Sequence, residues 1–284
     1  SMPAPISGAG VFVSERLLMS VNKTPKSSSA SLAILGGGNL GKALARGLVR
    51  SGTLLPDRIQ VTRRNPDGLE DLAAEGFRVG TDNIAAIRVA ETVLIAVQPQ
   101  QIADLLDQIC DELDSARHTV ISVVSGVPVS QLREMIPTPI PVVRAMPNTA
   151  VSIGESMTCL SADPDSMDGL EEAEALFKGV GITLRIQDEM MVGATALCAC
   201  GIAFFLRSVR AASQGGIEIG FHAEDALLLA SQTARGAASL ALRDNQHPES
   251  EIDRVTTPRG CTIAGLNEME HQGFSSAMIK GFLL

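Results

Sequence analysis

The sequence contains no tryptophan and no tyrosine, and its aromatic content is only 3%. Proteins that hold single-stranded nucleic acid commonly stack its bases on aromatic side chains, so this composition argues against such a partner. The net charge of -9 and the pI near 5.0 also argue against a nucleic acid held by charge. We therefore expect no nucleic-acid partner, and no tyrosine is present to act as an acid catalyst.

Thiols and imidazoles are few and scattered. The five cysteines contain no CxxC pair, and the four histidines form no ligand cluster. We therefore expect neither a disulfide framework nor a metal site, and reduced thiols in a cytoplasmic protein fit this pattern. Cys198 and Cys200 lie two residues apart, and this spacing on a helix points their side chains away from each other. We interpret them as packed thiols.

No secretory or membrane-spanning segment is evident in the sequence. The first residues lack the charged and apolar regions of a signal peptide. Uninterrupted apolar runs fall short of the roughly 20 residues that cross a bilayer, so we expect no membrane partner. The polar, serine-rich stretch around residues 20–30 indicates that residues 1–30 are a flexible leader.

The length of 284 residues suits two domains. Short apolar runs alternate with segments of helical periodicity, as expected for βαβ units and a parallel sheet. The expected strands are residues 32–35, 59–62, 77–80, 92–97, 119–124 and 140–143. Long apolar helical patterns then dominate. The fold class expected is an α/β Rossmann domain over residues 31–165, followed by an all-α domain over residues 166–284.

A glycine-rich turn follows the expected strand 32–35. Gly36, Gly38 and Gly41 form a G-x-G-x-x-G motif directly before a helical segment. In this motif the first glycine allows a tight turn, the second lets the backbone approach a pyrophosphate, and the third lets helix and strand pack closely. The pyrophosphate then lies at the positive end of the helix. The sequence therefore predicts a dinucleotide site here.

The end of the second strand favours NADP over NAD. An NAD enzyme usually has an acidic residue there, which binds the ribose 2′-hydroxyl. This chain has Thr62, Arg63, Arg64 and Asn65 instead. Guanidinium groups suit a 2′-phosphate in charge and in geometry. We expect NADPH as the cofactor, with NAD as the alternative, and one of the two arginines could be an ordinary surface charge.

Eight motifs along residues 31–275 carry a resemblance to a known family. They are GGGNLG (36–41), VQPQ (97–100), ISVVSG (121–126), RAMPNTAVSIGE (144–155), TAL (195–197), QTARGAA (232–238), HP (247–248) and VTTPRGCTIAGLNEME (255–270). In order and spacing they resemble the pyrroline-5-carboxylate reductase family. MPNT and the TTPxGxT segment are the most specific of the eight.

The resemblance implies a Rossmann domain joined to a helical domain that dimerises by intertwining. It implies NADPH-dependent reduction of the C=N bond of 1-pyrroline-5-carboxylate to L-proline, and a homodimer or higher homo-oligomer. The catalytic and substrate residues expected are Thr257, Gly260, Cys261 and Thr262. The expected cofactor-binding residues are Gly36, Gly38, Asn39, Leu40, Gly41, Arg63, Arg64, Asn65, Asn83, Ala96, Val97, Gln98, Pro99, Met146, Pro147 and Asn148.

The chemistry of these residues agrees with the implied reaction. An iminium carbon is already electrophilic, so the protein mainly has to hold two rings face to face. Backbone N–H groups near Gly260 and Cys261 could bind a carboxylate, and the Thr262 hydroxyl could reach a ring nitrogen. The same segment also reads as an ordinary helix start capped by Thr256 or Thr257. Both interpretations can hold together, because a helix start is also an anion site.

Several positions depart from the family pattern. Two serines of the usual Ser-Gly-Ser-Gly-Pro run are Cys198 and Cys200, and the proline is Ile202. Arg259 stands where the substrate loop usually has glycine. Further changes are Gln98 in place of lysine, Ala150 in place of proline, and Val192 in place of aspartate. These changes leave two alternatives open. The protein could be a reductase for another cyclic imine carboxylate, or a diverged NADP-binding paralogue without this activity.

A β-hydroxyacid dehydrogenase shares this expected architecture but is disfavoured. Those enzymes use a lysine proton donor on the interdomain helix, and no lysine lies in the long helical segment that starts near residue 190. The segment from 188 to 245 is apolar on more than one face, which is more than a small monomeric domain could bury. The sequence therefore predicts an obligate dimer formed through this segment.

Overall fold

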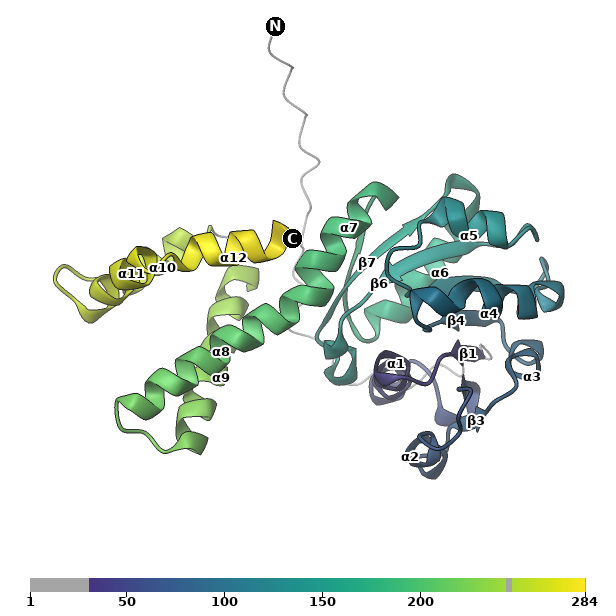
Figure 1. The fold of residues 1–284 in the computed structure, drawn as a ribbon, viewed down its shortest axis with the longest axis horizontal. Coiled ribbons are helices and arrows are strands. Elements are labelled where there is room, and N and C mark those ends of the chain that lie inside the picture. The colour runs from purple at the N-terminus through teal and green to yellow at the C-terminus, as the bar shows by residue number, and fades with distance from the viewer. Residues whose placement is uncertain (1–30, 244–246, 284) are drawn as a thin grey trace, which may run out of the picture.

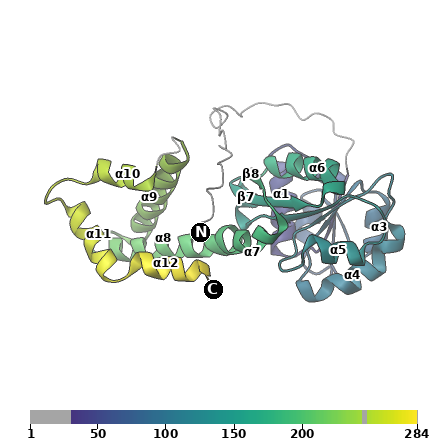
Figure 2. The same cartoon turned by 90° about the horizontal axis from the view of Figure 1, so that it is seen from above.

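The computed structural model describes residues 31–243 and 247–283. The expected leader, residues 1–30, lies outside the described residues. The chain forms a sheet domain and a separate helical arm, which lie at opposite ends of the molecule in two perpendicular views (Figure 1, Figure 2). This arrangement confirms the predicted fold class.

The sheet has eight strands in the order β3-β2-β1-β4-β5-β6-β7-β8. The first six strands are parallel, β7 is antiparallel to β6, and β8 is parallel to β7. The order reverses direction beside β1, which is the switch point where α/β sheets bind their ligands. The strands are β1 Leu32–Leu35, β2 Ile59–Thr62, β3 Arg78–Gly80, β4 Thr92–Ile95, β5 Thr119–Ser122, β6 Val142–Met146, β7 Ser156–Ala162 and β8 Gly181–Arg185.

Helices cover both faces of the sheet, because the buried strands are apolar on both sides. Alternate residues of β1 point to opposite faces, with Leu32 and Ile34 in one core cluster and Ala33 and Leu35 in the other. The first cluster includes side chains of α1 Asn39–Arg50, α2 Glu70–Ala74 and α6 Met167–Lys178. The second includes those of α3 Asn83–Arg88, α4 Ile102–Ile109 and α5 Val129–Met135.

The sheet continues to Arg185, beyond the boundary near residue 165 that the sequence suggested. The expectation of a purely helical chain from 166 onward missed β8, and the strand β7 was also not expected. β8 is an edge strand with exposed Ile182, Leu184 and Arg185, so it lacks the buried apolar run that marks the inner strands. Glu174 on α6 anchors it by accepting hydrogen bonds from Thr183 and Arg185.

The arm begins with one long helix and folds back on itself. A 3-10 turn (Asp188–Met190), α7 (Met191–Ala194), a π-helical turn (Thr195–Cys200) and α8 (Gly201–Glu218) form a continuous helix over residues 188–218. The arm continues with α9 Ala223–Arg243, α10 Pro248–Val255, α11 Cys261–His271 and α12 Phe274–Leu283. α9 packs along α8. The ring of Phe282 in α12 contacts the ring of Phe204 in α8 edge to face, with the ring centroids 5.1 Å apart.

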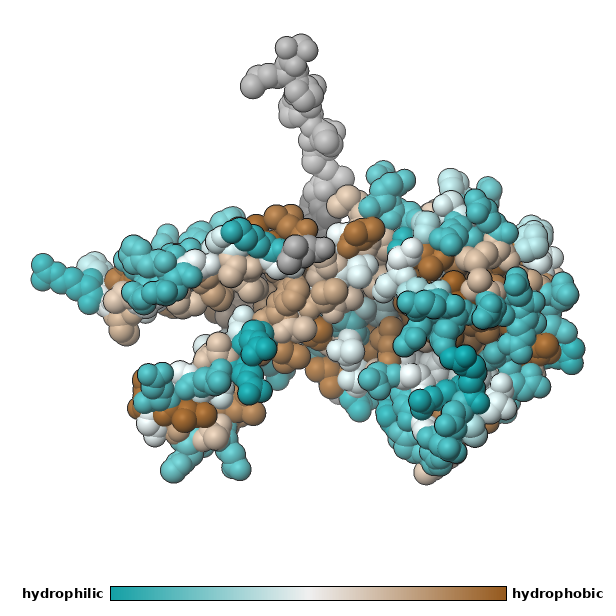
Figure 3. Space-filling model, viewed as in Figure 1, coloured by the Kyte–Doolittle hydropathy of each residue, from teal (hydrophilic) through white to brown (hydrophobic). Residues whose placement is uncertain are grey.

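The helix 188–218 is long and apolar enough to cross a membrane, judged by length and composition alone. The expectation that no segment reaches this length is therefore wrong. Only 11% of its most apolar window is buried within the chain, and Figure 3 shows apolar surface along the arm. The exposed apolar residues of the arm include Leu197, Phe205, Leu206, Ile217, Ile219, Leu227, Leu228, Leu229, Leu240 and Leu242.

One ion pair ties the arm to the sheet. Arg144 of β6 is 3% exposed, and its Nη1 lies 3.0 Å from Oδ1 of Asp188, where the arm begins. The other carboxylate oxygen of Asp188 accepts a hydrogen bond from the backbone N–H of Val129. The Asp188 carboxylate thus joins β6, the start of α5 and the first residue of the arm.

We expect Arg144→Leu to lower the free energy of unfolding by about 2–4 kcal/mol, because the Asp188 carboxylate would lose the buried cation that neutralises it. Arg88→Leu is the matched control, since the Arg88–Glu112 pair lies at the surface, where water and salt screen it, and its loss should change stability far less. Urea unfolding at one protein concentration measures the free energy of unfolding of the two variants and of the unmodified protein. Equal losses in the two variants would contradict a structural role for the Arg144–Asp188 pair.

Candidate functional site

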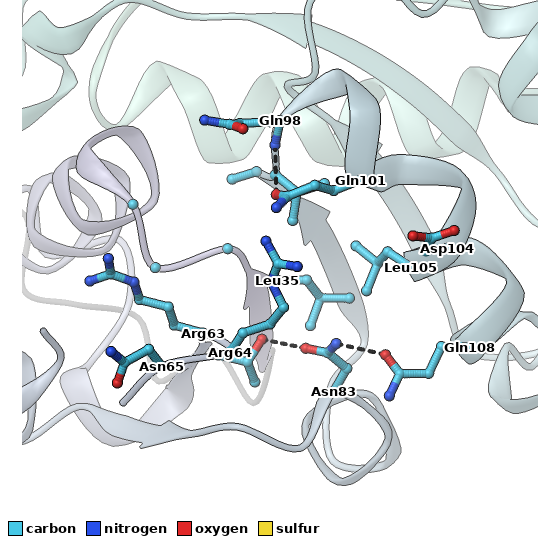
Figure 4. A pocket seen from close by; sticks show the side chains of 16 residues that line it. Leu35, Arg63, Arg64, Asn65, Asn83, Gln98, Gln101, Asp104, Leu105 and Gln108 are labelled. Atoms are coloured by element: carbon cyan, nitrogen blue, oxygen red, sulfur yellow. Dashed lines mark hydrogen bonds between the residues drawn. The ribbon is translucent and has the colours of Figure 1, made fainter. Parts of the chain in front are cut away.

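A cleft of about 510 Å³ opens at the carboxyl ends of β1, β2 and β4. Figure 4 shows side chains from both halves of the sheet pointing into it. Because this is the point where the strand order reverses, both neighbouring loops turn away and leave a crevice. Its lining residues are Leu35, Gly36, Gly37, Gly38, Thr62, Arg63, Arg64, Asn65, Asn83, Ala96, Val97, Gln98, Gln101, Asp104, Leu105 and Gln108.

The glycine turn at β1 has the conformation that the motif predicts. Gly36 has a φ of 122°, and a Cβ built there would lie 2.3 Å from the carbonyl oxygen of Ala96. At Gly41 a Cβ would lie 2.1 Å from the carbonyl oxygen of Gly36, so helix and strand could not pack as closely with any other residue. At Gly38 nothing lies within 4 Å. The backbone at Gly38 is therefore open to a ligand.

The two arginines after β2 line the cleft and lie in different directions. Arg64 extends into the middle of the cleft, and Arg63 extends away from it (Figure 4). The Arg63 guanidinium lies against Gly68, with Nη1 2.2 Å from the position that a Cβ would take there. Within residues 31–243 and 247–283, neither arginine forms an ion pair with a carboxylate. Both positive charges remain available to an anionic ligand.

A chain of hydrogen bonds fixes one wall of the cleft. The Thr62 hydroxyl donates to Asn83 Oδ1 at 2.6 Å, and Asn83 Nδ2 donates to Gln108 Oε1 at 3.0 Å. The amide of Asn83, expected as a site residue from its motif, is thus held in one orientation by neighbours on β2 and α4.

The residues at the start of α4 and along it were not expected to line the cleft. Gln101, Asp104, Leu105 and Gln108 all line it. Their spacing of i, i+3, i+4 and i+7 places them on one helix face, and this signal was present in the sequence. The polar members of the set made this face look like an ordinary solvated surface.

Several expected cofactor residues do not line the cleft. Asn39 and Leu40 open α1, Pro99 follows Gln98, Met146 is the last residue of β6, and Pro147 follows it. The side chain of Asn148 instead binds the arm, since its Nδ2 donates to the carbonyl oxygen of Cys198 at 3.2 Å. The Met146–Asn148 segment therefore adjoins the joint between the sheet and the arm.

The expected substrate residues lie far from this cleft. The loop 256–260 connects α10 and α11 at the distal end of the arm, and both views place it away from the sheet (Figure 1, Figure 2). Thr262 lies in the first turn of α11, whose N-cap Gly260 makes no side-chain capping bond. Arg259 has a φ of 62°, the only positive φ at a non-glycine position in the described residues. A single copy of the chain does not bring this loop to the cleft.

Comparison with known proteins identifies the family. Residues 188–283 match the family model described as pyrroline-5-carboxylate reductase dimerisation, and residues 31–126 match NADP oxidoreductase coenzyme F420-dependent. The chain is 45% identical over 277 residues to pyrroline-5-carboxylate reductase 2 of Dictyostelium discoideum, an alignment that covers 92% of both chains. The chain belongs to the pyrroline-5-carboxylate reductase family.

A second relative differs in length. Pyrroline-5-carboxylate reductase 1 of Dictyostelium discoideum is 50% identical over 264 residues, which cover 89% of this chain and 48% of that protein. The chain therefore spans about half the length of this relative. The family resemblance stated from the motifs is confirmed, and so is the expected class of enzyme, an oxidoreductase.

Solved structures of pyrroline-5-carboxylate reductases have the same architecture as this chain. A pyrroline-5-carboxylate reductase of Coxiella burnetii has a TM-score of 0.80 at 28% identity, covering 90% of this chain and 96% of its own. A pyrroline carboxylate reductase of Plasmodium falciparum with NADP bound has a TM-score of 0.81 at 22% identity, covering 89% and 94%. The second comparison supports the fold alone.

The glycine turn makes a paired prediction. Gly36→Ala should lower the free energy of unfolding by about 2–4 kcal/mol, because the new Cβ meets the Ala96 carbonyl and the backbone φ becomes strained. Gly38→Ala should change it by less than about 1 kcal/mol, because the φ of Gly38 is −82° and its surroundings are open. Urea unfolding of both variants is the measurement. A Gly38→Ala protein as unstable as Gly36→Ala would contradict this geometry.

Proposed function

We propose that the protein reduces the C=N bond of 1-pyrroline-5-carboxylate to give L-proline, with NADPH as the hydride donor. Family membership at 45% identity over 92% of the chain supports this activity. The structure supports it through the dinucleotide cleft at the switch point of the sheet. We also propose that the protein is a cytoplasmic enzyme of proline biosynthesis.

The cleft fits an NADP molecule in shape and in charge. Gly38 leaves the backbone open, so the N-terminus of α1 with Asn39, Leu40 and Gly41 could hold a pyrophosphate on free N–H groups. Arg63 and Arg64 have no carboxylate partner within the part of the chain that the structure describes, and they suit a 2′-phosphate, with Asn65 beside them. Asn83, Ala96, Val97 and Gln98 border the remaining length of the cleft. When bound, the nicotinamide supplies the hydride.

The loop before α11 is proposed to bind the substrate carboxylate. α11 has 11 residues, and its first N–H groups, at Cys261 and Thr262, are not capped by a side chain. Free N–H groups at a helix start favour an anion. The Thr262 hydroxyl then orients the imine nitrogen, and Thr257 shapes the turn, since Gly260 N donates to the carbonyl oxygen of Thr257 at 2.9 Å.

Arg259 adds a positive charge beside this loop at a cost in backbone energy. A non-glycine residue with positive φ is strained by roughly 1 kcal/mol or more, and such strain is found most often at functional sites. The side chain is exposed in the single chain and has no ion-pair partner among the described residues. We propose that Arg259 strengthens the attraction for a carboxylate substrate.

We further propose that each active site is completed by a second copy of the chain. The substrate loop lies at the end of the arm that is away from the sheet domain (Figure 1), and the cleft lies at the carboxyl ends of β1, β2 and β4. The arm between them exposes the apolar residues given above, and residues 188–283 match a dimerisation family model. A partner arm could cover these surfaces and carry its own loop 256–260 to the cleft. Met146, Pro147 and Asn148 adjoin the base of the arm, where such a loop would arrive.

The cofactor preference tests the arginine assignment. Replacing Arg63 and Arg64 together with alanine should weaken NADPH binding by roughly 1–3 kcal/mol per lost charged contact and leave NADH binding nearly unchanged. The single variants separate the two, and Arg64 should matter more because it extends into the cleft. Titration of cofactor fluorescence gives the constants, with Arg58→Ala as a surface control. Equal NADH and NADPH affinity in the unmodified protein would contradict the assignment.

The substrate loop makes a kinetic prediction. Thr262→Ala should lower kcat/KM for 1-pyrroline-5-carboxylate about tenfold or more, because it removes a hydrogen bond that orients the imine. NADPH affinity should not change, since the loop carries no part of the cofactor cleft. Thr262→Ser is the matched control and should retain most of the activity. Unchanged imine reduction by Thr262→Ala, across a panel of cyclic imine carboxylates, would contradict the assignment of this loop.

The exposed apolar residues of the arm predict the oligomeric state of the protein. The protein should sediment as a dimer or a larger oligomer at micromolar concentration, because the arm cannot bury its apolar residues alone. Leu206→Asp together with Leu228→Asp should produce monomers that still bind NADPH but have lost imine reduction. Leu55→Asp, at an exposed apolar residue of the sheet domain, is the control. A native monomer with full activity would refute the shared site.

A further inference from the structure

The joint between the sheet and the arm contains two thiols that the reduction of an imine does not require. Cys159 lies on β7 and is 3% exposed, and Cys198 lies in the π-helical turn of the arm and is half-buried. Their Sγ atoms are 4.0 Å apart. Among the described residues, no other pair of cysteine sulfurs lies in contact. The pair joins two segments that are 39 residues apart in the sequence.

The surroundings hold both thiols in place. They belong to a small apolar cluster with the buried side chains of Met146 and Met191. Cys159 is paired with Met146 in the register of β6 and β7. The carbonyl oxygen of Cys198 accepts the hydrogen bond from Asn148. Each cysteine is therefore held through its own backbone, with its sulfur in contact with the sulfur of the other.

The hydrogen bond between the thiols makes them chemically unequal. Either thiol can donate the hydrogen bond between the two sulfurs. This bond and burial raise the pKa of the Cys159 thiol, and the bond lowers the pKa of Cys198. A thiolate is the nucleophilic form of cysteine. Cys198 is also the more exposed of the two, so it is the sulfur that a peroxide reaches first, and Cys159 is the sulfur positioned to react with its product.

We propose that Cys159 and Cys198 form a redox-active dithiol, which a peroxide oxidises to a disulfide between the sheet and the arm. The Cys198 thiolate attacks one oxygen of hydrogen peroxide and the O–O bond breaks, which gives a sulfenic acid and a hydroxide; the hydroxide takes up the proton that the Cys198 thiol released on ionising and leaves as the first water. The sulfur of Cys159 then attacks the Cys198 sulfur, the S–O bond breaks, and a second water leaves with the Cys159 proton. Two thiols are oxidised and one peroxide is reduced.

This bond would lock the base of the arm to the sheet. The arm leaves the sheet domain at Asp188, and the disulfide would add a covalent link ten residues further on, beside Asn148. A cross-link between positions far apart in the sequence also restricts the unfolded chain, so it raises stability. The oxidised protein should therefore melt several degrees higher than the reduced protein.

The test uses the full chain and does not depend on its activity. The protein is treated with hydrogen peroxide, the remaining thiols are alkylated, and the peptides are mapped by mass spectrometry without reduction. We expect a cross-linked peptide that joins Cys159 to Cys198 within one chain, its loss on treatment with dithiothreitol, and a higher melting temperature before that treatment. Cys200→Ser, which removes the exposed neighbouring thiol, should leave the cross-link unchanged.

Two further variants test whether the cross-link needs both cysteines. Cys159→Ser and Cys198→Ser should both abolish the cross-link and the rise in melting temperature, and Cys159→Ser should leave Cys198 as a sulfenic acid that dimedone traps. Exclusive cross-links through Cys200 or between two chains would overturn the proposal. Oxidation of Cys198 in the native protein to a sulfinic acid without any cross-link would also overturn it.

Discussion

An arm that cannot bury its own apolar side chains determines how this protein works. The helix 188–218 is mostly unburied in one copy, and α9 adds further exposed leucines. In water, apolar surface of this extent favours association. In the shared site proposed above, association through the arm brings the substrate loop of one copy to the cofactor cleft of another. Assembly and catalysis would then depend on the same surface.

The joint between the two parts concentrates the polar interactions that set the direction of the arm. A buried arginine reaches Asp188 at the first residue of the arm, and Asn148 binds the carbonyl oxygen of Cys198 one segment later. Both contacts start from β6 or from the residues that follow it. Because the arm is long, a small rotation at its base would become a large displacement of the loop 256–260. The rigidity of the joint is thus a condition for an active site shared between copies.

The sequence indicated the parts of the fold that depend on local pattern. The inner strands are buried apolar runs, and the glycine turn at residues 36–41 has the backbone that its motif predicts. The edge strand β8 was missed because its side chains are largely exposed and carry no such pattern. The long helical segment expected from near residue 190 corresponds to the helix 188–218.

Part of the cleft was predictable, because some of its residues belong to a local sequence motif. Residues on β1 and β2 follow a known motif, but the contribution of α4 required the helix to be placed against Asn83 in space. The Cys159–Cys198 contact was not predictable, because it depends on how two segments far apart in sequence meet at the joint. The interpretation of Cys198 and Cys200 as two packed thiols holds for Cys198, which is half-buried, but not for Cys200, which is exposed.

The most direct test of a shared site is complementation between two inactive variants. Gly38→Asp places a carboxylate where the backbone is open to the cofactor, and Thr262→Glu places one in the substrate loop. Co-expression of both chains should restore activity to about a quarter of the native level, because about half of randomly paired dimers are mixed and each has one intact site of two. If each site were formed within one chain, every site in the mixture would carry one defect, and no activity would return.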